Sequence, residues 1–93
     1  MKATNINGTS DNNCRCGSWL QHWTNYGGRV QFPLCSASGC NRFADVGAHV
    51  HKEYDYKWSI IPLCYEHNNQ YGQTIEVKPD TVFVPASKSE TCG

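Results

Sequence analysis

Two pairs of residues in the chain have the types and the spacing of metal ligands. Cys35 and Cys40 enclose four small residues, Ser-Ala-Ser-Gly, which let the chain turn tightly and direct both sulfur atoms at one point. Cys64 and His67 lie three residues apart, a spacing that places two side chains on one face of a helix. Tetrahedral zinc prefers thiolate and imidazole to oxygen donors. The pattern therefore predicts one structural zinc ion, and the alternative is two core cysteines beside a surface histidine.

Length and composition favour such an ion. A chain of 93 residues with 39% hydrophobic content forms one small domain that buries little surface, and six cysteines with four histidines can supply the missing stability through metal or through disulfides. The first residues contain no apolar targeting or membrane-spanning segment, so we expect a cytoplasmic protein. A reducing compartment favours metal over disulfides, and a secreted disulfide-bonded domain is the alternative.

The charge balance limits the range of partners. Lys and Arg number eight, as do Asp and Glu, so the chain has no overall attraction to a phosphate backbone. A local basic surface remains compatible with this balance. We expect a nucleic-acid or protein partner, and no motif for a small-molecule cofactor is evident.

The first half of the chain is expected to contain one helix and one short strand. Residues 1–13 are polar and predict a disordered segment, so a single zinc-binding domain would span 14–93. A helix is predicted from Ser18, with Trp19, Trp23 and Tyr26 forming an aromatic stripe. The following "RVQFPLC" predicts a short strand with Val30 and Phe32 on one face.

The second half predicts a β-hairpin, a helix and further strands. Two extended runs, 46–51 and 57–63, surround a polar turn, and a short helix should begin after Pro62 and end at Gly72. The run "TIEVKPDTVFV" predicts a C-terminal β-hairpin around a Pro-Asp turn. The fold class is thus a small α+β zinc-stabilised domain.

The order of ligand-bearing turn, hairpin and helix resembles the treble-clef zinc fold. Within that group "VGAHV", "WSIIPLC" and "EHN" resemble the zinc-stabilised HNH endonucleases, and the resemblance covers about Cys35 to Gly72. It implies that His49 stands where that family's general base activates water. Asn68 matches the last motif position and could bind a metal through its carbonyl oxygen.

Two motif positions depart from the family pattern. Ala48 stands where the family has the aspartate that binds the catalytic metal, and Ser59 stands where it has an asparagine. Substitute ligands would be His51, on the same strand face as His49, or Asp45. The chain also resembles a group of small bacterial proteins that share "GAH", which implies that Ala48 belongs to that group's own pattern. We therefore expect a non-catalytic HNH-like module, with an active metal-dependent endonuclease as the alternative.

The remaining cysteines allow a second metal site. Cys14, Cys16 and Cys92 offer three thiolates, and His22 or His49 could complete the set. The alternatives are a disulfide from Cys92 to one of the other two cysteines, or three free thiols.

The turn of the predicted hairpin is the candidate contact surface. Tyrosines there can stack on bases while basic side chains meet phosphates, or the turn is a solvated loop whose tyrosines cover the edge of the core. The candidate contact residues are Arg42, Lys52, Tyr54, Tyr56 and Lys57.

Overall fold

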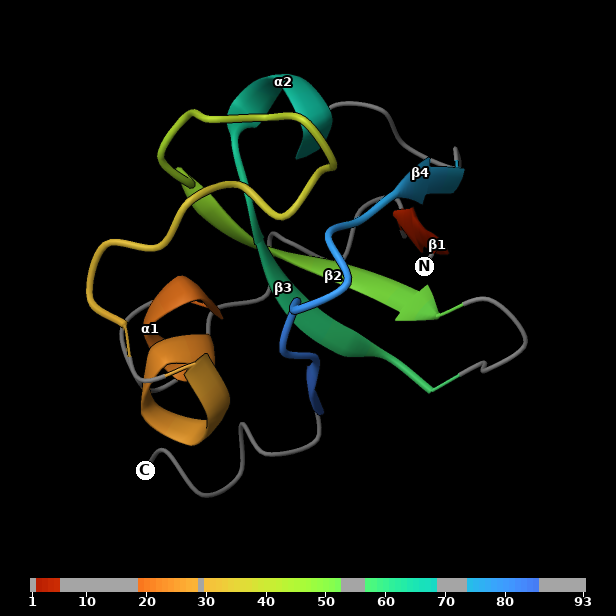
Figure 1. The fold of residues 1–93 in the computed structure, drawn as a ribbon. Helices are drawn as coiled ribbons and strands as arrows, with labels where there is room; N and C mark the ends of the chain where they lie inside the picture. Colours follow the sequence, from red (N-terminus) through yellow and green to blue (C-terminus); the bar gives the residue numbers. More distant parts are fainter. Residues whose placement is uncertain (1, 6–18, 29, 53–56, 69–73, 86–93) are drawn as a thin grey trace.

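A five-stranded antiparallel sheet lies at the centre of the computed structural model, which describes residues 2–5, 19–28, 30–52, 57–68 and 74–85. The strands lie in the order β4-β1-β2-β3-β5 (Figure 1). Their bounds are β1 (Lys2–Asn5), β2 (Val46–Lys52), β3 (Ser59–Leu63), β4 (Thr74–Glu76) and β5 (Val84–Pro85). The helical elements are α1 (Trp19–Trp23), its π-helical continuation η1 (Thr24–Gly28) and α2 (Tyr65–Asn68). Within the described part of the chain, every helix is too short to cross a membrane.

Strands β2 and β3 form the predicted hairpin, which is confirmed. Their register runs from Val46 opposite Leu63 to Val50 opposite Ser59. Alternate side chains of a strand point to opposite faces, and here Val50, Ile61 and Leu63 enter the larger of two hydrophobic clusters. Cys35 and Cys64 belong to the same cluster, so the main core and the cysteines share one face of the hairpin.

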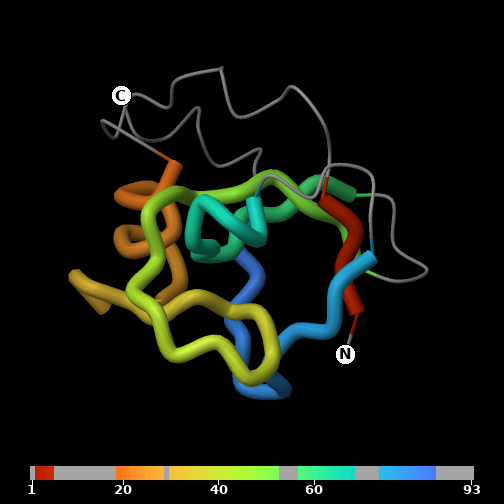
Figure 2. The backbone as a smooth tube through the Cα atoms, turned by 90° about the horizontal axis from the view of Figure 1, so that it is seen from above, coloured from red at the N-terminus to blue at the C-terminus, as the bar shows by residue number. Residues whose placement is uncertain are grey.

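The helix α1 packs on the hairpin at very short range. A β-carbon on Gly47 of β2 would lie 2.4 Å from the backbone carbonyl carbon of Trp19, so only glycine fits there. The second, smaller cluster joins Trp23 to Ile60 and Val84. Figure 2 shows α1 on one side of the structure and β1 with β4 on the other, with α2 between them.

The helix was predicted, but its aromatic stripe is incomplete. Trp23 is buried, whereas Tyr26 is 40% exposed. The chain changes from α-helical to π-helical geometry after Trp23, and the wider turn rotates later side chains away from the α-helical stripe.

The expectation of disorder over residues 1–13 was wrong for the first strand. Lys2–Asn5 forms β1, between β4 and β2 in the sheet. Ala3 and Asn5 are buried, and the Asn5 Nδ2 donates a hydrogen bond to the Asn68 carbonyl oxygen at 2.6 Å. A polar side chain can be buried when it has such a partner, which composition alone does not reveal. Residues 6–13 lie outside the described residues.

The predicted C-terminal hairpin was also wrong. Strand β4 pairs with β1 at one edge of the sheet, and β5 pairs with β3 at the other. The Pro-Asp turn is present, with the Thr81 N–H donating to the Lys78 carbonyl oxygen at 3.1 Å. After the turn, the chain therefore crosses from one edge of the sheet to the other. A local sequence pattern cannot specify which strand a segment will pair with.

The strand predicted around Val30 and Phe32 is absent from the described residues. Val30 is 48% exposed and Phe32 is 78% exposed. The segment pairs only at Leu34, which lies opposite Phe43 in an isolated bridge. This bridge instead closes the base of the turn that carries Cys35 and Cys40.

Candidate metal centre

The turn from Cys35 to Cys40 is shaped by its own backbone hydrogen bonds. The Cys35 N–H donates to the Arg42 carbonyl oxygen at 2.8 Å, and the Cys40 N–H donates to the Ala37 carbonyl oxygen at 3.1 Å. Gly39 has a φ of 78°, a conformation that residues with a β-carbon adopt at a cost. The small residues that the sequence offers between the cysteines thus allow the tight turn.

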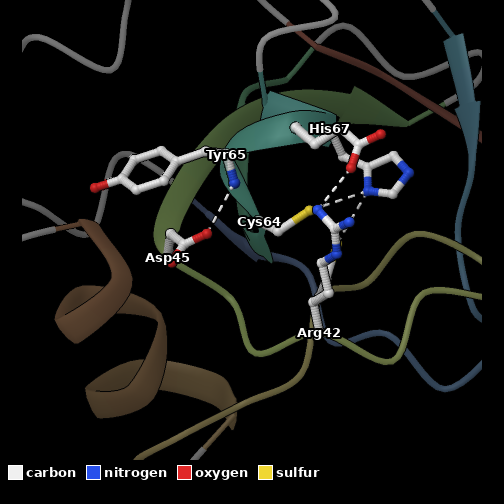
Figure 3. A network of polar contacts seen from close by, with 7 residues as sticks. Arg42, Asp45, Cys64, Tyr65 and His67 are labelled. Atoms are coloured by element: carbon white, nitrogen blue, oxygen red, sulfur yellow. Dashed lines mark hydrogen bonds and ion pairs between the residues drawn. The ribbon is translucent and has the colours of Figure 1, made fainter.

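The second pair of side chains comes from the end of β3 and from α2. Asp45, which precedes β2, accepts a hydrogen bond from the Tyr65 N–H at 2.9 Å and so satisfies one unpaired donor at the start of α2. An ion pair of 2.6 Å joins Arg42 to Glu66 over the outside of the turn. Figure 3 shows these contacts around Cys64 and His67, with the Tyr65 ring pointing away from them.

All four side chains converge on one point. The Sγ atoms of the three cysteines and the His67 imidazole nitrogen lie within 4.8 Å of one another. The His67 Nδ1 is 3.1 Å from the Cys64 Sγ and 3.6 Å from the Cys35 Sγ, so Nδ1 is the nitrogen that faces the sulfur atoms. Tetrahedral zinc with ordinary bond lengths separates sulfur from nitrogen by about 3.6 Å and sulfur from sulfur by about 3.8 Å. The cluster could therefore hold one zinc ion after small shifts of the side chains, in which the His67 Nδ1 and the Cys64 Sγ move apart and the most widely separated ligand atoms move closer.

The pKa values of two of the thiols are shifted in opposite directions. Burial raises the pKa of the Cys35 thiol to about 11. A hydrogen bond from the Arg42 backbone lowers the pKa of the Cys40 thiol, which lies nearer the surface. A thiol with a high pKa stays protonated at neutral pH unless a metal displaces the proton, so filling the site releases protons.

Three thiols and an imidazole are the donor set of structural zinc sites. All four positions of a tetrahedron are filled by protein, which leaves no open position for water or substrate. Within the described residues, no other group of three or more Cys, His, Asp or Glu side chains lies close enough to share an ion. The arrangement is suited to stabilising the fold, because an ion held by these four side chains would join the turn to the end of the hairpin.

His49 lies away from this cluster, in the packing between β2 and α1. Its ring is 3% exposed and meets the Trp19 ring edge-on at 4.4 Å between centroids. Its Nδ1 is buried without a hydrogen-bonding partner. Burial, and after it the electrostatic interaction with His22, lowers the pKa of His49 to about 4.

The sheet lies between His49 and Asn68, the other residue of the resembled motif. Asn68 is buried on α2 and is held through its carbonyl oxygen by Asn5, which lies opposite Val50 in the sheet. Because paired residues share a face and His49 precedes Val50, His49 and the Asn5 side chain belong to opposite faces. The half-buried His51 has its Nδ1 3.3 Å from the Lys52 carbonyl oxygen.

Of Cys14, Cys16, Cys92 and His22, which form the second predicted metal site, the structure describes His22 only. The buried His22 lies on α1, and its Nε2 donates to the Pro85 carbonyl oxygen at 3.1 Å. Cys14, Cys16 and Cys92 lie outside the described residues, so the alternatives of metal, disulfide and free thiols remain predictions.

Two residues near the cluster have roles that sequence reasoning missed. Asp45 was considered as a catalytic metal ligand, whereas it binds the first backbone N–H of α2. The Lys78 Nζ donates to the carbonyl oxygens of Cys35 and Cys40 at 2.9 and 2.8 Å. No spacing signal connects Lys78 to residues some forty positions earlier, so only the fold reveals the contact.

Comparison of the chain with protein-family models, with curated proteins and with solved structures finds no match.

Removal of one ligand should remove one ion. We expect Cys64→Ala to contain one zinc per chain less than the wild-type protein and to lose cooperative thermal unfolding, because structural zinc binds with about 10 kcal/mol or more of apparent free energy. Atomic emission and circular dichroism measure the two effects. His51→Gln, outside the cluster, should keep the wild-type zinc content. Equal zinc content in Cys64→Ala and the wild type would contradict the site.

The buried His49 should make stability depend on pH. With a folded pKa of about 4 against an ordinary 6.5, the folded protein binds fewer protons than the unfolded chain between these values. Its contribution is therefore complete above pH 6.5 and is lost as pH falls towards 4, by up to about 3 kcal/mol. The measurement is the free energy of unfolding of the wild type minus that of His49→Leu, from denaturant titrations across this range. The metal cluster is common to both proteins, so a difference that is constant with pH would contradict the assignment.

Proposed function

We propose that this protein is a zinc-stabilised binding domain with a treble-clef arrangement, similar to HNH endonucleases in architecture but non-catalytic, and that its partner is another protein. The observation that carries the zinc assignment is the convergence of four ligand atoms within 4.8 Å of one another. Ligands from two distant segments gather in this way when one ion is their shared partner.

The order of the elements supports the treble-clef assignment. The turn at Cys35 and Cys40 precedes the hairpin of β2 and β3, and α2 follows the hairpin at once with the second ligand pair. The additions are α1 on one side and β1 with β4 on the other, around this central unit (Figure 1).

The surroundings of His49 argue against catalysis. A catalytic magnesium-type ion requires oxygen donors, and the adjacent Ala48 supplies none. Asp45, the carboxylate that directly precedes this strand in the sequence, is engaged at the start of α2. A general base must also reach its substrate, and the His49 ring is buried against Trp19.

An exposed apolar groove supports a protein partner. Phe32 and Phe43 are 78% and 67% exposed, which is unusual for such large apolar side chains. They border a groove of about 370 Å³ whose other lining residues are mostly apolar; the lining set is Leu20, Gln31, Phe32, Pro33, Phe43 and Ala44. Exposed apolar surface of this kind marks protein interfaces.

The partners of two basic side chains favour an uncharged, apolar segment over a nucleic acid. Arg42, which precedes Phe43, is neutralised by Glu66, and the Lys52 ammonium lies 4.7 Å from the centre of the Phe83 ring. Two of the basic residues expected to contact phosphates therefore have partners within the protein. Tyr54 and Tyr56, which were expected to stack on bases, lie outside the described residues. We propose that the occupant is a peptide segment with aromatic or aliphatic side chains and little charge.

The protein should not cleave DNA. With magnesium, manganese or nickel added, we expect wild-type protein and His49→Ala to leave supercoiled plasmid equally intact, as read on agarose gels. The active-endonuclease alternative requires the opposite result: nicking by the wild type that His49→Ala abolishes while zinc content and circular dichroism remain unchanged.

The groove should select apolar peptides. We expect a displayed library of random twelve-residue peptides, panned on zinc-loaded protein, to enrich sequences rich in aromatic and aliphatic residues. These peptides should shift the NMR signals of Leu20 and Phe43, and Phe43→Ser should weaken their binding roughly tenfold, since a buried aromatic anchor contributes 1–2 kcal/mol or more. The matched control is Tyr65→Ser, which changes an exposed aromatic residue outside the groove. Failure to enrich any peptide, together with gel shifts of oligonucleotides at low salt, would contradict a protein partner and indicate a nucleic acid instead.

A further inference from the structure

Lys78 makes two contacts to the metal cluster from a distant part of the chain. Its ammonium nitrogen donates to the Cys35 carbonyl oxygen at 2.9 Å and to the Cys40 carbonyl oxygen at 2.8 Å. These are the first and last residues of the ligand-bearing turn, and both carry a ligand sulfur atom. One half-buried cation therefore connects the two ends of the turn.

The backbone around Lys78 is already docked on the same turn. Ala37 lies opposite Val77 in an isolated bridge. The Ser38 N–H donates to the Glu76 carbonyl oxygen at 2.9 Å, and the Lys78 N–H donates to the Ser36 carbonyl oxygen at 2.9 Å. These bonds fix the middle of the turn, and the lysine side chain then fixes the two residues that bear the ligands.

The lysine charge is suited to its location. Two carbonyl oxygens directed at one place repel each other unless a donor lies between them, and an ammonium group with three donors can serve both. A zinc ion with three thiolates and a neutral imidazole has a net charge of about −1, so a fixed cation beside the turn also lowers the cost of that charge.

We infer that Lys78 is a positioning residue for the metal centre, which holds the Cys35–Cys40 turn in the geometry that offers both sulfur atoms to one ion. The inference rests on the proposed zinc-binding function. Residues that orient metal ligands without touching the metal typically change metal affinity roughly ten- to hundredfold when they are replaced. Lys78 thus contributes to zinc affinity even though it donates no ligand atom.

The experiment compares zinc affinity in four proteins by competition with a chromophoric chelator. Lys78→Met keeps the length of the side chain but removes the charge and the donors, and Lys78→Arg restores both. Lys57→Met, at an exposed lysine away from the turn, controls for the loss of one positive charge. We expect roughly ten- to hundredfold weaker zinc binding in Lys78→Met, wild-type affinity in Lys57→Met and substantial recovery in Lys78→Arg.

Cobalt spectra separate a positioning role from a general loss of structure. At saturating cobalt, Lys78→Met should still show the absorption bands of a tetrahedral thiolate site, because all four ligands are intact. Zinc affinity in Lys78→Met within twofold of the wild type would overturn the inference and leave the proposed function standing. Absence of zinc binding by the wild-type protein would instead overturn the proposed function.

A measurement on the unaltered protein covers the case in which Lys78→Met does not fold. In zinc-loaded protein labelled with nitrogen-15, the Lys78 ammonium protons should exchange slowly enough with water to be observed at low temperature, because two carbonyl oxygens hold them. The exposed Lys57 is the reference, and its ammonium protons should exchange faster than those of Lys78. Equally fast exchange at both lysines would overturn the assignment.

Discussion

The convergence of two distant segments on one cluster of ligand side chains is the constraint on which the structure depends. The turn that carries Cys35 and Cys40 meets Cys64 and His67, and the four side chains could hold one metal ion. Burial raises the pKa of Cys35 to about 11, so the thiol keeps its proton at neutral pH unless a metal ion binds the sulfur and displaces it. Because a chain of 93 residues buries little apolar surface, an ion bound at this cluster would supply stability that the core alone does not.

Several neighbouring elements hold the ligand-bearing segments of the cluster in place. The hairpin of β2 and β3 ends at Cys64, Asp45 satisfies the first N–H of α2, and the segment 76–78 docks on the ligand-bearing turn. On the other face of the hairpin, α1 approaches Gly47 closely and covers His49. That packing places the histidine in the core, which supports the proposal of a domain that binds a partner through Phe32 and Phe43 and performs no hydrolysis.

The sequence predicts the parts of this structure that depend on local spacing. Cysteine and histidine spacing identifies the cluster, two extended runs around a polar turn identify β2 and β3, and Ser18 with the following aromatics identifies α1. It does not predict strand partners, because pairing of β4 with β1 and of β5 with β3 is decided by distant segments. It also misses β1, since the polar Asn5 is buried only by virtue of its hydrogen bond to α2. The sequence also does not predict the role of Lys78, because its hydrogen-bonding partners are backbone atoms some forty residues away.

X-ray absorption at the zinc edge of the purified protein tests the central claim most directly. If Cys35, Cys40, Cys64 and His67 hold one ion, the first shell consists of three sulfur atoms at about 2.3 Å and one nitrogen atom at about 2.0 Å. The loss of one sulfur scatterer in Cys40→Ala would identify the site as this cluster. A first shell of nitrogen and oxygen atoms only, or a protein that retains its fold with no metal at all, would contradict the account.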